Sequence, residues 1–87
     1  MPPELNTETI CAIVTDTLKV TNKKDALSGD ITAASRMGDP KEWDSLSFVA
    51  VFTAIGTAFD VELEDDDAIH FQSITAIEAF LKDIMDE

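Results

Sequence analysis

The sequence predicts an all-α fold: a small antiparallel four-helix bundle with three longer helices, a short third helix and a long structured loop between helices 1 and 2. Two observations predict it. Apolar residues recur at helical spacing over three separate stretches, and residues that favour helix N-caps stand where those stretches begin. The 87 residues predict a single domain, 1–87, with one small core, and we expect a monomer.

The first helix is expected from about Thr7 to Val20, with Asn6 as its N-cap. Lys19 near its end suits the negative pole of the helix dipole. Its predicted core face combines aliphatic side chains with one threonine: Ile10, Ile13, Val14, Thr17 and Leu18.

The loop over 21–43 shows no helical stripe, and a structureless connection of that length is unusual in a compact domain. A short helical turn over 31–37, capped by Asp30, is therefore expected inside it. Ile31 and Met37 would hold this turn against the core. Gly38, followed by a proline, gives the stop signal.

The second helix is expected from Ser45 to about Phe59. Asp44 stands at the N-cap position, where its carboxylate accepts a hydrogen bond from one of the unpaired amides of the first turn. Ser45 is then the first helical residue, with its hydroxyl directed outward. Taken alone, this pattern is also ordinary capping chemistry. The stripe expected to face the core is Leu46, Val49, Thr53, Ile55 and Phe59, which places Phe48 near the surface beside the serine.

Six acidic residues fall within Asp60–Asp67, but the spacing lacks the glycine and the final glutamate of an EF-hand loop. We interpret the run as a solvated acidic face, with loose divalent-ion binding as the alternative and no dedicated metal site. A short third helix is expected over Asp66–Phe71. Ser73 then caps the last helix, whose predicted stripe is Ile74, Ile77, Phe80, Leu81 and Ile84.

The composition of the chain limits which molecules it can bind and in which cellular compartment we expect it. With 18 acidic and 6 basic residues the formal net charge is −12, so nucleic acid and anionic membranes are poor partners and proteins with basic patches are good ones. No segment approaches the about 20 apolar residues of a membrane span, and no secretory signal is evident, so we expect a cytoplasmic protein. The single cysteine, Cys11, excludes an internal disulfide and is expected at the core or its boundary.

Asp44, Ser45 and Leu46, with the following runs 47–52 and 59–63, resemble the signature of acyl carrier proteins. The resemblance extends without gaps from Asp44 to about Phe71. It implies that Ser45 carries 4′-phosphopantetheine, transferred from coenzyme A by a separate phosphopantetheinyl transferase that supplies Mg²⁺ and the catalysis. Acyl groups would then be held as thioesters for partner enzymes of fatty-acid, lipid or specialised acyl pathways. We therefore expect no catalytic residue in this chain.

The resemblance also implies roles for the residues around the serine. Asp44, Leu46 and Phe48 are expected to contribute to docking of acyl-loading and acyl-transferring enzymes with basic patches. An acyl chain would be sheltered between the second and third helices by six residues, for which simple core packing is the alternative reading: Val49, Phe52, Ile55, Leu63, Ala68 and Phe71.

The second helix departs from the common fatty-acid carriers. Four residues, Ala50, Gly56, Thr57 and Ala58, occupy positions where those carriers usually have glutamates. Trp43 before the Asp-Ser-Leu triplet resembles stand-alone carriers of specialised pathways. These departures indicate a specialised docking face. Gly56 costs about 1 kcal/mol relative to alanine inside a helix. It is either tolerated on the surface or required because a group packs closely against it.

Two other function classes remain open. An unmodified acidic helical adaptor would bind a basic protein through the same charge. A hydrolase would need Ser45, His70 and an acid as a triad, but the sequence has no Gly-x-Ser-x-Gly elbow.

Overall fold

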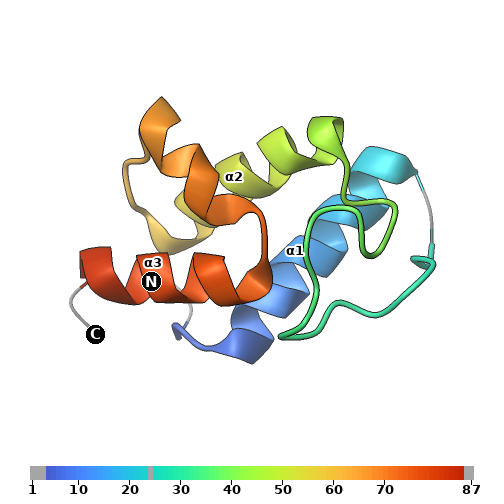
Figure 1. Cartoon of the computed structure of the whole chain (residues 1–87), viewed down its shortest axis with the longest axis horizontal. Helices are drawn as coiled ribbons and strands as arrows, with labels where there is room; N and C mark the ends of the chain where they lie inside the picture. The colour runs from blue at the N-terminus through green and yellow to red at the C-terminus, as the bar shows by residue number, and fades with distance from the viewer. Residues whose placement is uncertain (1–3, 24, 86–87) are drawn as a thin grey trace.

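In the described part of the chain, four helical segments follow one another in the order α1, α2, η1 and α3 (Figure 1). The computed structural model describes residues 4–23 and 25–85. The α-helices are α1 (Thr7–Asn22), α2 (Ser45–Phe59) and α3 (Ile74–Met85), and η1 (Asp65–Phe71) is a 3₁₀ helix. No strand occurs within the described ranges, so the predicted all-helical class is confirmed.

The predicted caps of the first and last helices are present. The Asn6 side chain accepts a hydrogen bond from the Thr9 amide at 2.8 Å, and Ser73 Oγ accepts one from the Ala76 amide at 3.1 Å. α1 ends at Asn22, two residues later than predicted, and Lys23 follows in the left-handed conformation with φ 55°. The extra turn is supported by the Asn22 side-chain amide, which donates to the Leu18 carbonyl at 2.8 Å.

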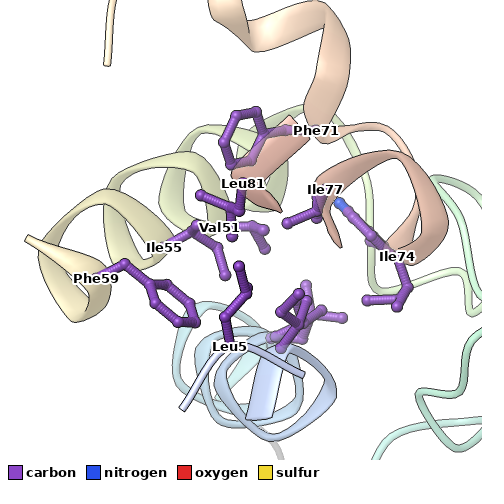
Figure 2. Packing of buried hydrophobic residues seen from close by; sticks show 12 residues of the cluster. Leu5, Val51, Ile55, Phe59, Phe71, Ile74, Ile77 and Leu81 are labelled. Carbon is purple, nitrogen blue, oxygen red and sulfur yellow. The ribbon is translucent and has the colours of Figure 1, made fainter. Parts of the chain in front are cut away.

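The core gathers one stripe from each α-helix together with Leu5 before α1, Trp43 two residues before α2, and Phe71 at the end of η1. α1 contacts α2 and α3, and η1 contacts α2 and α3. Figure 2 shows side chains of these elements pointing toward one another. The fully or nearly fully buried residues of the core are Leu5, Ile10, Val14, Leu18, Trp43, Val51, Ile55, Phe59, Phe71, Ile74, Ile77 and Leu81.

The buried face of α2 differs from the predicted stripe. Its buried residues are Ser47, Val51, Ile55 and Phe59, whereas Leu46 is 85% exposed and Val49 is 61% exposed. Thr53 is exposed as well, and Phe48, predicted near the surface, is half-buried against the core. The prediction is confirmed for Ile55 and Phe59 and wrong for Leu46, Val49 and Thr53. It failed there because α2 carries apolar residues on every side, so spacing alone does not identify one face.

The predicted helical turn over 31–37 is absent. Its backbone groups pair with the start of α3 instead, because the Met37 amide donates to the Gln72 carbonyl at 2.8 Å and the Ile74 amide donates to the Ser35 carbonyl at 3.1 Å. Ile31 and Met37 nevertheless pack against the core, as predicted. The loop is therefore structured by long-range backbone hydrogen bonds rather than by a helix of its own.

Two details of the C-terminal half also differ from expectation. η1 begins at Asp65, one residue earlier than predicted, and the Glu64 amide donates to Asp67 Oδ2 at 2.9 Å at its start. In α3 the buried stripe is confirmed for three aliphatic residues, but Ile84 is exposed and Phe80 is half-buried.

A neighbouring side chain packs closely against Gly56. Asp60 adopts the left-handed conformation with φ 53° at the end of α2, and the Val61 amide donates back to the Gly56 carbonyl at 3.0 Å. This turn folds Leu63 onto the helix, so that a Cβ at position 56 would lie 2.9 Å from Leu63 Cδ1. Of the two readings of this glycine, the structure supports the close-packed neighbour.

Candidate functional site

Ser45 is the first residue of α2 and its side chain is exposed. Asp44 caps the helix as predicted: its Oδ1 accepts hydrogen bonds from the Leu46 amide at 3.1 Å and the Ser47 amide at 3.0 Å. The Phe48 amide donates to the Asp44 carbonyl at 2.8 Å. Among the described residues, the Ser45 hydroxyl has no hydrogen-bond partner. It is therefore an accessible hydroxyl on a capped first turn.

The two residues before Asp44 are anchored by buried side chains. Trp43 is fully buried in the core, and the side chain of Glu42 is buried as well. The Ser28 amide donates to Glu42 Oε2 at 3.0 Å, and Ser28 Oγ donates to Glu42 Oε1 at 2.7 Å. These contacts connect the long loop to the start of α2, so they fix where Ser45 emerges.

The end of α1 supports the same turn from the other side. Ser47 is only 2% exposed, and its Oγ lies 3.1 Å from Thr21 Oγ1. The Asn22 side-chain amide donates to Ser47 Oγ at 3.3 Å and to the Glu42 carbonyl at 3.2 Å. The two serines of this turn therefore differ in kind: Ser47 is a structural residue, and Ser45 is accessible.

An apolar pocket of about 400 Å³ lies between α2 and η1. We call it the α2–η1 pocket; its lining residues are Phe48, Val49, Phe52, Thr53, Asp65 and Ala68. Three of the six residues predicted to shelter an acyl chain, Val49, Phe52 and Ala68, thus lie together in its wall. The structure brings these residues to one place although α2 and η1 are separate segments of the chain.

The other three predicted sheltering residues are not among those that line this pocket. Phe71 is fully buried and meets Phe52 edge to face, with ring centroids 4.9 Å apart. Ile55 is also fully buried in the core. Leu63 lines a neighbouring pocket of about 240 Å³ that shares Phe52 and Thr53 with the first.

The first turn of α2 suits a covalent phosphate better than a dissociable one. A free anion at a helix N-terminus needs unpaired amides, and Asp44 already occupies those of Leu46 and Ser47. What remains is the Ser45 amide, for which the described residues supply no acceptor, and the helix dipole, which contributes only about 0.3–1 kcal/mol. A covalent phosphate on the exposed Ser45 hydroxyl, in contrast, would leave the hydrogen bonds of Asp44 to the Leu46 and Ser47 amides in place.

Within the part of the chain that the structure describes, the remaining titratable side chains form no metal-binding group, and His70 makes no hydrogen bond with Ser45. His70 stacks on Phe80, with ring centroids 4.8 Å apart and planes 8° from parallel, and no hydrogen bond joins it to Ser45 or to an acid. No group of three or more His, Cys, Asp or Glu residues within 4–23 and 25–85 is arranged to hold a metal ion. Burial, with a smaller contribution from Glu78, raises the pKa of the Cys11 thiol, which keeps it neutral.

Sequence reasoning missed three features near the serine. The burial of Trp43 and the support of the first turn by α1 depend on contacts between distant segments, and no local pattern announced them. The exposure of Leu46 was also missed, although an N-cap at Asp44 fixes the rotation of the first turn.

None of the described helices is long and apolar enough to cross a membrane. Neither family models, curated proteins nor solved structures gave a match to the chain.

Proposed function

We propose that this chain carries acyl groups as thioesters on a 4′-phosphopantetheine arm attached to Ser45. The observation that carries the proposal is the exposed, unpartnered Ser45 hydroxyl on the capped first turn of α2, close to an apolar pocket. The resemblance of residues 44–71 to acyl carrier proteins supplies the identity of the arm. In this proposal the helices form the antiparallel bundle of that family, and the chain acts as a cytoplasmic monomer without catalytic residues.

Attachment would be a substitution at phosphorus in coenzyme A. Ser45 Oγ forms a bond to the phosphorus that bears the pantetheine, adenosine 3′,5′-bisphosphate leaves, and the serine proton passes to a base on the separate transferase. The chain contributes position rather than catalysis. Asp44 holds the first turn through its two amide contacts, so the hydroxyl meets the transferase in one orientation.

The α2–η1 pocket is the proposed shelter for the acyl chain. Val49, Phe52 and Ala68 offer apolar wall, with Phe71 packed behind Phe52. Each methylene moved from water into such a site contributes about 0.8 kcal/mol. Asp65 at the wall disfavours entry of an anionic group, so the carried group would enter by its apolar end.

Docking of partner enzymes is proposed around the same turn. Leu46 lies exposed directly beside Ser45, Asp44 contributes a carboxylate, and the half-buried Phe48 reaches the rim of the pocket. The chain's net charge of −12 favours enzymes with basic patches. α2 itself contains no charged residue. This supports an interface with partner enzymes that is apolar at its centre, over α2, and charged at its periphery.

Intact-mass measurement after incubation with coenzyme A, Mg²⁺ and a broad-specificity phosphopantetheinyl transferase tests the proposal. We expect a mass increase of one phosphopantetheinyl group in the wild-type chain and none in Ser45→Ala. Ser47→Ala is the matched control, because it removes a hydroxyl from the same turn but leaves the accessible serine in place. Circular dichroism at the assay temperature establishes that both variants are folded.

An unmodified wild-type chain would overturn the carrier proposal and favour the second candidate, an acidic adaptor for a basic protein. The observation behind this candidate is the exposed run of acids from Asp60 to Asp66. The two candidates differ in their need for Ser45: binding of a basic partner by an adaptor would survive Ser45→Ala unchanged.

A further inference from the structure

A second apolar concavity lies on the other side of α2, between that helix and the C-terminal half of α1. We call it the α1–α2 groove; its volume is about 300 Å³ and its lining residues are Asp16, Thr17, Val20, Thr21 and Ala50. Its accessible wall is almost entirely apolar. Val20, one of its lining residues, is 77% exposed. Valine forms helices less readily than the polar residues common on helix surfaces, so helix propensity does not explain a valine at this exposed position.

The groove has a fixed position relative to Ser45. Thr21 Oγ1 lies 3.1 Å from Ser47 Oγ, and the Asn22 side chain donates to the same oxygen at 3.3 Å. Val20 directly precedes these two residues on α1, and Ser47 lies two residues after Ser45 on α2. The serine and the valine are therefore held on one rigid unit, so a rigid partner meets both in one arrangement.

We propose that the enzyme that modifies Ser45 places an apolar side chain in the α1–α2 groove, with Val20 and Ala50 as its contacts. This inference rests on the proposed function, because an enzyme that forms a bond to Ser45 Oγ must lie over the first turn of α2. A standard interface buries about 800 Å² per partner. That area is roughly a seventh of the 5407 Å² accessible surface of this chain, far more than one helical turn offers, so the interface extends to neighbouring surface.

Charge identifies the kind of surface that fits. Among the described residues that line the groove, Asp16 is the one ionisable side chain, and Asp44 lies on the serine's own turn. An apolar side chain flanked by basic residues complements this arrangement, because it fills the groove while its neighbours face the two carboxylates. A second copy of this chain fits poorly, since each copy carries a net charge of −12 and the copies repel.

The test measures kcat/KM for phosphopantetheinylation by the broad-specificity transferase, using initial rates from intact mass at varied carrier concentration. Val20→Gln keeps the net charge and changes an exposed side chain, so the fold should persist. We expect kcat/KM to fall at least about fivefold, mainly through a higher KM, as for an interface contact of moderate energy. Ile84→Gln is the matched control, because it replaces an exposed aliphatic residue on α3, and its kcat/KM should equal that of the wild type.

A second variant checks the groove itself. Ala50→Leu fills it with the chain's own side chain, and we expect a similar loss of kcat/KM with wild-type circular dichroism. If Ser45 is modified in the wild type but both variants stay within twofold of it, the groove is not a contact and this inference is overturned while the carrier proposal stands. If no modification occurs even in the wild type, the carrier proposal fails and the inference fails with it.

Discussion

Replacing Asp44 with alanine tests how the start of α2 is stabilised. The substitution removes the acceptor for the Leu46 amide at 3.1 Å and the Ser47 amide at 3.0 Å, and it leaves the backbone bond from Phe48 to position 44 in place. Loss of an N-cap side chain costs about 1 kcal/mol, within a range of roughly 0.5–2 kcal/mol. For a domain of this size, 1 kcal/mol corresponds to a fall in Tm of about 4–8 °C.

Two control variants separate capping from charge. Asp25→Ala removes one acid from an exposed loop position, where no hydrogen bond joins its side chain to another described residue, so it measures the relief of repulsion in a chain of net charge −12. Asp44→Asn removes the same charge but keeps a good N-cap residue. Both should unfold close to the wild-type temperature in thermal scans followed by circular dichroism. If Asp44→Ala is no less stable than Asp25→Ala, the cap does not hold this turn and the reasoning about Ser45's position fails.

Two further predictions concern the core and the contact between α1 and α3. Ile55→Ala should lower the free energy of unfolding by about 2–5 kcal/mol because the side chain is fully buried, whereas Leu46→Ala should change it by less than about 0.5 kcal/mol; equal costs in urea unfolding would contradict the observed rotation of α2. Hydrogen bonds from Thr7 and then Lys82 lower the pKa of the Glu78 carboxyl below its ordinary value of 4.5. A lowered pKa stabilises the folded chain above the ordinary value, and that stabilisation is lost as the pH falls through the folded-state pKa. The stability difference between wild type and Glu78→Gln should therefore be largest near neutral pH and shrink in acid below about pH 4.5, and a difference that does not change with pH would refute it.

Local signals predicted the boundaries and caps well. Asn6, Asp44 and Ser73 each cap the helix that the sequence assigned to them. Capping involves atoms within three residues of one another, so the local sequence holds all the information. The same holds for Ser45 as the first residue of α2.

Local signals failed where the partner of a backbone or side-chain group lies far along the chain. Residues 31–37 do not form the predicted turn, because the Met37 amide pairs with the Gln72 carbonyl next to α3. The spacing of apolar residues in the sequence does not tell where η1 and the loop before it pack relative to α2. The pocket beside Phe52 was therefore predicted only through a family resemblance.

The sequence by itself determined an all-helical chain, the caps that start three of its helices and an outward-facing serine at the start of α2, because each follows from short-range periodicity and capping. The tertiary structure decided which side of α2 is buried. That helix is apolar on all sides, so its rotation is set by Trp43 in the core and by the contacts of Ser47 with Thr21 and Asn22. This rotation leaves Leu46 and Val49 exposed beside Ser45, with an apolar concavity on each side of the helix.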